Sequence, residues 1–150
     1  MSQAVLMSIH PEWVWKIFHE EKRVEMRKTR PNLEPPFKVY VYQTLPKWGD
    51  WNEQDGHVVG EFVCNTITKY PDFDCCVANT LETLAMMERA EMRKYANGKT
   101  LYGWHISDLV IYDKPKELSE FKHWQEDGMR VWMEPVTRPP RSWMYVEELK

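Results

Sequence analysis

The chain has 150 residues, of which 43% are hydrophobic and 29% are charged, and its formal net charge is -3. These values exclude an intrinsically disordered chain and predict a single globular domain over residues 1–150, long enough to bury a core. A negative net charge also excludes a protein that coats nucleic acid with a generally basic surface, so a nucleic-acid site would have to be a local patch.

The apolar runs are too short for a membrane span, and the N-terminus lacks the basic region and long apolar stretch of a secretory signal. We therefore expect a cytoplasmic protein that does not enter the membrane. The three cysteines, Cys64, Cys75 and Cys76, are odd in number and no CxxC occurs, so neither a disulfide framework nor a zinc site is indicated. We expect reduced thiols in or near the core, and neither a metal nor a cofactor.

The first predicted elements are a strand at 4–9, a helix at 10–21 and a strand at 22–27. Pro11 fits the first helical position, where its missing N–H is not needed. The helix carries one apolar stripe at helical spacing, formed by Trp13, Val14, Ile17 and Phe18.

The clearest strand is 37–44, which follows a loop rich in proline. In it Val39 and Val41 alternate with Tyr40 and Tyr42, so we expect one pair to face the core and the other to face outward or toward a cleft. A polar turn region at 46–56 precedes a further strand at 57–68, which we expect to bend at Gly60.

A second helix is predicted at 79–97, with a capping box of Asn79 and Glu82 at its start and Gly98 at its end. Its methionines are expected in the core rather than in a partner groove, namely Met86, Met87 and Met92.

The rest of the chain predicts a strand at 101–113, a turn with a single helical turn within 114–124, a weak strand signal after 128, a proline-rich turn, and a final strand at 142–147. Strands and helices do not alternate regularly, which argues against a doubly wound sheet. The pattern favours a mixed α+β fold, mainly β: a curved sheet closing toward a small barrel, flanked by two main helices at about 10–21 and 79–97.

The segment 22–30 concentrates positive charge around one acid, Glu25; its basic residues are Lys22, Arg23, Arg27, Lys28 and Arg30. Glu25 and Arg27 share one face of the predicted strand, and Lys22 lies in the turn before it. A carboxylate between cations stays ionised, and the cations keep their charge.

This cluster has three interpretations. It can be a structural ion-pair network. It can bind nucleic acid, with Arg27 and Lys28 holding phosphate while Glu25 accepts a hydrogen bond from a base amino group. It can also be catalytic, with a desolvated Lys22 as base or nucleophile and Glu25 as a proton shuttle.

Three segments resemble the ASCH family, named for activating signal cointegrator homology. "VLMSIHPEWVWKIFHEEKRVEMRKTRP" (5–31) is similar to the opening of that family: Lys22, Glu25 and Arg27 match its K-x-x-E-x-R motif, and Glu20 stands where a glycine is usual. "GHVVGEF" (56–62) resembles its central strand, and "YGWHISDLVIYDKP" (102–115) resembles its late, aromatic-rich strand.

The resemblance implies a PUA-like pseudobarrel with a cleft between the first helix and the barrel, suited to RNA or a modified nucleoside. Some bacterial members remove the acetyl group of N4-acetylcytidine, and others are ribonucleases or plain RNA or DNA binders. If this chain is such an enzyme, Lys22 is its central residue. In the amidohydrolase members a threonine stands at the position of Glu25 and a further glutamate acts from before the second helix, where this chain offers Asp72 or Asp74.

Other candidates each have two interpretations. Ser8 and His10 either cap the first helix or form a polar rim for an anion. Trp104 is either core or a platform on which a base stacks, and His105 beside it is expected to be structural. Arg138 and Arg141 lie either on a solvated loop or at a second phosphate contact.

The sequence therefore predicts an RNA- or nucleoside-binding site formed by Ser8, His10, Lys22, Glu25, Arg27, Lys28 and Trp104. Two alternatives remain: an enzyme centred on Lys22 and Glu25, and a protein-interaction module that uses exposed tryptophans as anchors. No Ser/His/Asp elbow, phosphate-binding glycine loop or HExxH motif occurs.

Overall fold

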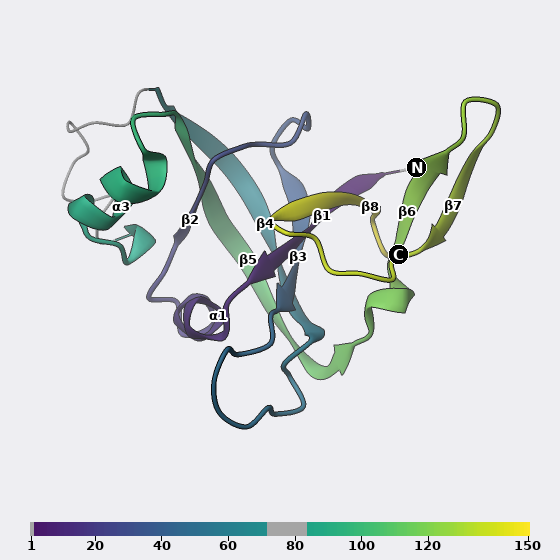
Figure 1. Ribbon diagram of the computed structural model, residues 1–150, viewed down its shortest axis with the longest axis horizontal. Coiled ribbons are helices and arrows are strands. Elements are labelled where there is room, and N and C mark those ends of the chain that lie inside the picture. Colours follow the sequence, from purple (N-terminus) through teal and green to yellow (C-terminus); the bar gives the residue numbers. More distant parts are fainter. Residues whose placement is uncertain (1, 72–83) are drawn as a thin grey trace.

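The computed structural model describes residues 2–71 and 84–150 (Figure 1). Its elements are β1 (Gln3–Ile9), α1 (Pro11–Phe18), β2 (Val24–Arg27), β3 (Phe37–Gln43), β4 (His57–Tyr70), α3 (Arg89–Ala96), β5 (Leu101–Lys116), a 3-10 turn (Leu118–Glu120), β6 (Lys122–Glu126), β7 (Val131–Pro135) and β8 (Trp143–Glu147).

Six of these strands form one mixed sheet in the order β2-β5-β4-β3-β1-β8. The pair β1 and β3 is parallel, and the other neighbours are antiparallel. In Figure 1, α3 lies outside β2 at one end of the molecule and the β6–β7 hairpin projects at the other. The predicted fold class, a mainly β mixed fold with two helices, is confirmed.

Strand β3 is buried on both faces. Val39 and Val41 pack in a core with residues of β1 and α1, whereas Tyr40 and Tyr42 pack with Phe121 in a second core. The prediction that one of these pairs faces outward is therefore wrong. The physical reason is tertiary: the segment after β5 folds back and covers the second face of the sheet.

Helix α1 is shorter than predicted, because the chain leaves the helical conformation after Phe18. Val14 and Ile17 are buried, as the apolar stripe predicts. Glu20 has a φ of 59°, in the left-handed region that favours glycine. The residue that replaces the usual glycine of the resembling motif thus keeps the backbone conformation of a glycine.

The second helix is also shorter than predicted. Met86 has a φ of 58°, so the helical residues before it do not continue into α3. The end is where the sequence places it: Asn97 caps α3 in the left-handed conformation, followed by Gly98 with a φ of 75°. The predicted capping box of Asn79 and Glu82 lies outside the described residues.

Other differences concern the second half of the chain. Strand β6 was not predicted, because its sequence, KHWQE, is polar and lacks the apolar alternation of a core strand. In the structure β6 pairs with β7 in a two-stranded hairpin. The bend expected at Gly60 is present as a shift in the register between β4 and β5. Among the described residues, no helix is long and apolar enough to cross a membrane.

Candidate functional site

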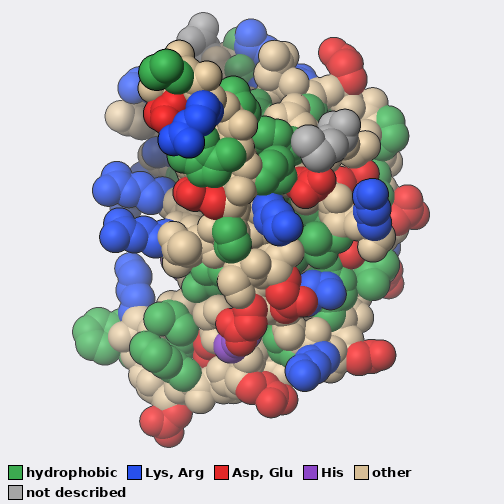
Figure 2. Space-filling model, turned by 90° about the vertical axis from the view of Figure 1, so that its right-hand side faces the viewer, with side chains coloured by type: hydrophobic (Ala, Val, Ile, Leu, Met, Phe, Trp, Pro, Cys, Tyr) green, Lys and Arg blue, Asp and Glu red, His purple; other side chains and the backbone are tan. Residues whose placement is uncertain are grey.

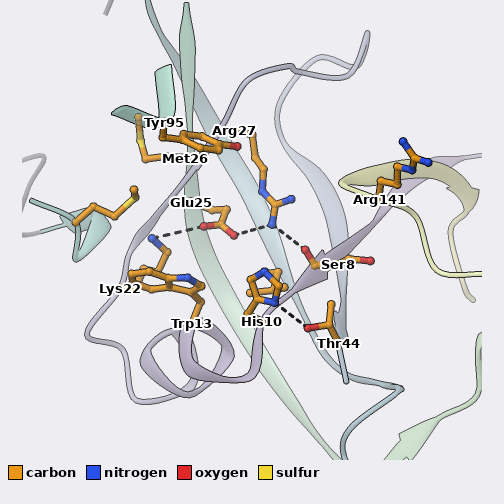
Figure 3. A pocket seen from close by; sticks show the side chains of 12 residues that line it. Ser8, His10, Trp13, Lys22, Glu25, Met26, Arg27, Thr44, Tyr95 and Arg141 are labelled. Atoms are coloured by element: carbon orange, nitrogen blue, oxygen red, sulfur yellow. Dashed lines mark hydrogen bonds and ion pairs between the residues drawn. The ribbon is translucent and has the colours of Figure 1, made fainter. Parts of the chain in front are cut away.

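A cavity of about 250 Å³ opens where β1 ends, α1 begins and β2 passes (Figure 3). Pockets for drug-sized ligands are about 300–1,000 Å³, so this cavity suits a base or a nucleoside better than a larger molecule. It lies beside β2, which is an edge strand of the sheet that the described residues form. Its polar walls come from Ser8, His10, Lys22, Glu25, Arg27 and Thr44.

Glu25 is the centre of a buried ion-pair cluster at this cavity. Its Oε2 lies 3.0 Å from Nη2 of Arg27, and its Oε1 lies 3.5 Å from Nζ of Lys22 (Figure 3). The Glu25 side chain is only 8% exposed. Burial pushes its pKa upward, but Arg27 and Lys22 outweigh that effect and hold the pKa below its ordinary value. The carboxylate is therefore ionised, as predicted.

Lys22 is almost completely buried, with 1% of its side chain exposed. Its Nζ donates a hydrogen bond to the carbonyl of Ala85 and lies 4.8 Å from the ring centre of Trp13. Burial lowers the pKa of Lys22, although Glu25 opposes the shift. The amine is thus desolvated in the way that the catalytic interpretation requires, while three neighbours hold it in place.

Arg27 has a second set of partners on the other side of the cavity. Its Nη2 donates to the carbonyl of Ser8 at 2.9 Å, and its Nη1 donates to the hydroxyl of Ser142 at 3.0 Å. The guanidinium therefore connects β2 to β1 and to the residue before β8, in addition to pairing with Glu25. This arrangement supports a structural role for Arg27 alongside any role in binding.

Ser8 and His10 lie at the mouth of the cavity and do not cap α1. The Ser8 hydroxyl donates to the carbonyl of Pro140 at 2.6 Å, and Nδ1 of His10 lies 3.1 Å from Oγ1 of Thr44. His10 is the N-cap residue of α1, but its side chain makes no capping hydrogen bond. Arg141, which is exposed, also lines the cavity from the proline-rich turn.

Two of the predicted residues lie elsewhere. Trp104 is completely buried in the core, where its Nε1 donates to the carbonyl of Thr29 at 3.3 Å. The core interpretation of Trp104 therefore holds, because the curved sheet turns that face of β5 inward. Lys28 is exposed, and its Nζ lies 4.7 Å from the ring centre of Tyr95, outside the cavity lining.

His105 and Cys64 are structural. Nε2 of His105 lies 3.0 Å from Oγ1 of Thr68, and burial lowers the pKa of His105. Burial raises the pKa of the free Cys64 thiol to about 11. Cys75, Cys76 and the candidate acids Asp72 and Asp74 lie outside the described residues. Within 2–71 and 84–150, no three His, Cys, Asp or Glu side chains gather in a way that could hold a metal ion.

Sequence reasoning missed the aromatic and apolar part of the lining, which includes Trp13, Met87 and Tyr95. Trp13 packs against the core, as the apolar stripe of α1 predicts, and its half-buried ring also lies beside Lys22 at the cavity. Tyr95 reaches the cavity because Met92 and Ala96 of α3 pack against Val24 of β2. No sequence signal could have located Tyr95, since this docking of α3 depends on tertiary contacts.

The sequence of residues 7–126 matches the family model of the ASCH domain. Among solved structures, the chain is similar to a serine-to-alanine mutant of the ASCH protein of Zymomonas mobilis. The two sequences are 20% identical, the superposition covers 97% of this chain and 89% of that chain, and the TM-score is 0.67. It is also similar to the structure of ASCH from the same organism, with 18% identity and a TM-score of 0.60, over 97% of this chain and 88% of that chain.

At these identities the structural likeness shows the fold alone. No curated protein matches the chain. The family match covers most of the chain, including the K-x-x-E-x-R segment, the central strand and the late strand on which the resemblance rests. The chain belongs to the ASCH domain family.

Proposed function

We propose that this ASCH domain binds RNA, or a modified nucleoside within RNA, in the cavity beside β2. The observation that carries the proposal is the buried, ionised carboxylate of Glu25 within a cavity of nucleoside size. A carboxylate accepts hydrogen bonds only, and it suits an exocyclic amino group such as N4 of cytosine. Each carboxylate oxygen can accept more than one hydrogen bond, so Glu25 can accept from a base while it stays paired with Arg27 and Lys22.

The aromatic side chains of the cavity fit the same ligand. In Figure 3, Trp13 and Tyr95 lie on opposite sides of Glu25. RNA-binding sites commonly stack an unpaired base on an aromatic ring while polar groups read its edge. A base between these rings would present its edge to Glu25.

Phosphate would be held locally rather than by a broad surface. On the face of the molecule that carries the β6–β7 hairpin, acidic and basic side chains are mixed over most of the surface, and several basic side chains gather along one edge (Figure 2). Arg141 is exposed at the cavity, whereas the guanidinium of Arg27 already has protein partners. Arg141 is therefore our candidate for the phosphate contact.

The test uses Arg141→Ala beside Arg138→Ala. Both arginines are exposed on the proline-rich turn, but only Arg141 lines the cavity. Binding of a fluorescent single-stranded RNA is measured by anisotropy over a range of salt concentrations. We expect Arg141→Ala to weaken binding and to reduce the salt slope by about one, because one phosphate contact is lost. Arg138→Ala should resemble the wild type.

Equal RNA affinities and equal salt slopes for Arg141→Ala and Arg138→Ala would contradict a phosphate contact by Arg141. If the wild type retains no RNA at any salt concentration, RNA binding is wrong and a protein-interaction module becomes the better interpretation.

The buried Lys22 favours a second candidate, an amidohydrolase acting on N4-acetylcytidine. Burial lowers the pKa of Lys22, which favours the neutral amine over the charged form. The neutral amine can take a proton from a water molecule while the oxygen of that water attacks the acetyl carbon. The amide C–N bond then breaks, the proton passes to the departing amino group, and acetate and cytidine are released. In the second candidate Glu25 holds Lys22 in place and shuttles the proton.

Mass spectrometry separates the enzyme from the binder. The wild type and Lys22→Met are incubated with N4-acetylcytidine and with a short single-stranded RNA. Loss of the acetyl group, or strand cleavage in the ribonuclease alternative, should depend on Lys22 if the protein is an enzyme. Absence of both products from the wild type, together with salt-sensitive RNA retention, would support binding alone.

A further inference from the structure

A second cavity, of about 390 Å³, lies beside the first and shares His10 with it. It lies between the start of α1 and the loop that follows β3, and Leu45, Lys47 and Trp48 form its wall on the loop side. The two cavities therefore adjoin at His10, with the Glu25 cluster lining the first and Trp48 lining the second.

Trp48 is the notable side chain of the second cavity, because 88% of it is exposed. A tryptophan normally buries most of its large apolar surface, so an indole held in solvent beside a cavity has surface available for a partner. The adjacent Lys47 supplies a positive charge at the same place, opposed by Glu12 on the helix side.

The loop that carries Trp48 is anchored at both ends. The amide of Thr44 donates to the carbonyl of Ile9 at 3.0 Å, which fixes the start of the loop next to the end of β1. At the far end, Asp55 is buried and accepts hydrogen bonds from the Gln43 side chain at 2.7 Å and from the Asn52 amide at 3.0 Å. These contacts fix both ends of the loop next to the strands of the sheet.

We infer that Trp48 is a stacking platform for the nucleotide next to the one bound in the Glu25 cavity, an inference that rests on the proposed function. An exposed aromatic ring beside a cation is the usual means of holding an unpaired base without reading its sequence. The preferred ligand is then a single-stranded oligonucleotide rather than a free nucleoside, because a free nucleoside has only one base and cannot occupy the Glu25 cavity and stack on Trp48 at once.

The experiment compares two ligands across matched variants. Isothermal titration gives the affinity of a short single-stranded RNA and of the nucleoside N4-acetylcytidine for the wild type, Trp48→Ala and Trp51→Ala. Trp51 is 65% exposed on the same loop but does not line the second cavity. We expect Trp48→Ala to weaken RNA binding by about 5- to 100-fold, the range measured for the loss of one base stack, and Trp51→Ala to have little effect.

Nucleoside affinity should be the same in all three proteins. An RNA series in which each nucleotide in turn is abasic then identifies the stacked base: at one position, base removal should weaken the wild type and leave Trp48→Ala unaffected.

Unchanged RNA affinity in Trp48→Ala would overturn the inference without contradicting the proposed function. A protein partner would then be the better interpretation of the surface around Trp48. The same conclusion follows if Trp51→Ala is as damaging as Trp48→Ala. If the wild type binds neither RNA nor nucleoside, the proposed function fails and the inference fails with it.

Discussion

The guanidinium of Arg27, on β2, donates to the hydroxyl of Ser142, 3.0 Å away and directly before β8. Strands β2 and β8 are the two edges of the six-stranded sheet. Arg27 therefore joins one edge of the curved sheet to the other through side chains, where no backbone ladder connects them. Trp143 adds a second link, since its Nε1 donates to Oγ1 of Thr29 at 2.9 Å. Arg27 also lines the cavity, together with Arg141 from the turn before β8.

Replacing Arg27 by lysine should destabilise the protein although the charge is kept. A lysine cannot contact Glu25, Ser8 and Ser142 at the same time, because it lacks the planar fork of the guanidinium. We expect the free energy of unfolding, measured by urea denaturation, to fall by about 1–3 kcal/mol. Arg23→Lys, at an exposed site nearby, should have almost no effect.

A double-mutant cycle with Ser142→Ala isolates the link between the two edges. Each single change should be destabilising, and the double mutant should lose less than the sum of the two. Strict additivity would mean that the contact between Arg27 and Ser142 contributes nothing to stability.

Glu25 should make stability depend on pH on the acid side. Burial raises its pKa, but Arg27 and Lys22 outweigh burial and hold the pKa below its ordinary value of 4.5. The unfolded chain therefore takes up this proton at a higher pH than the folded one does. The stabilisation is complete above pH 4.5 and is lost as the pH falls through the pKa of the folded state.

The measurement is the free energy of unfolding at about pH 7 and about pH 3 for the wild type and Glu25→Gln. Glu25→Gln should be less stable at neutral pH by about 3–5 kcal/mol, the usual cost of breaking a buried ion pair, and should lose less on acidification. Glu91→Gln, at an exposed position of α3, should follow the wild type. Parallel acid losses in all three proteins would show that Glu25 is not responsible.

Gly60 should not tolerate a side chain. A Cβ at this position would lie 2.6 Å from the carbonyl oxygen of Val110 and 2.8 Å from Cζ of Phe18. Relieving that overlap requires a shift of the β5 backbone, so Gly60→Ala should destabilise by about 1–3 kcal/mol in thermal or urea denaturation. Gly103→Ala meets only side-chain atoms, at 3.1 Å or more, and should cost less. The reverse order would contradict this account of the bend in β4.

Glycine at position 20 should stabilise the protein. Glu20 has a φ of 59°, which costs an L-residue about 1–2 kcal/mol, and the greater freedom of glycine in the unfolded chain offsets part of the gain. We expect Glu20→Gly to raise the free energy of unfolding by about 0.5–1 kcal/mol. Glu21→Gly, whose φ is not positive, should lower it slightly; a rise in both variants would point to a change in charge rather than in backbone conformation.

Short-range patterns account for what was predictable. The alternation in the segment 24–27 correctly places Val24 in the core against α3 and brings Glu25 and Arg27 to the cavity, although Met26, which packs in the same core as Val24, also lines the cavity. The spacing of Lys22 before that strand correctly brings its amine to Glu25, because a turn and a strand of fixed geometry leave little freedom over three residues. The resemblance of three separate segments to the ASCH family predicted the fold for the same reason, because the local pattern of each segment is consistent with the same fold.

The burial of each face of the sheet was not predictable in this way. Periodicity shows that two side chains share a face, but it does not show whether other elements cover that face. The burial of Tyr40 and of Trp104 is therefore known only from the structure. The lining residue Tyr95 and the carbonyl of Ala85 that holds Lys22 come from a segment more than sixty residues away in the chain.

The sequence by itself determined most of the strands, the presence of two helices, the charge cluster and the family, since these depend on neighbours along the chain. Tertiary structure alone decided that the cluster is buried, that Arg27 closes the sheet and that Trp48 stays exposed, because burial depends on which distant segments exclude water from a side chain.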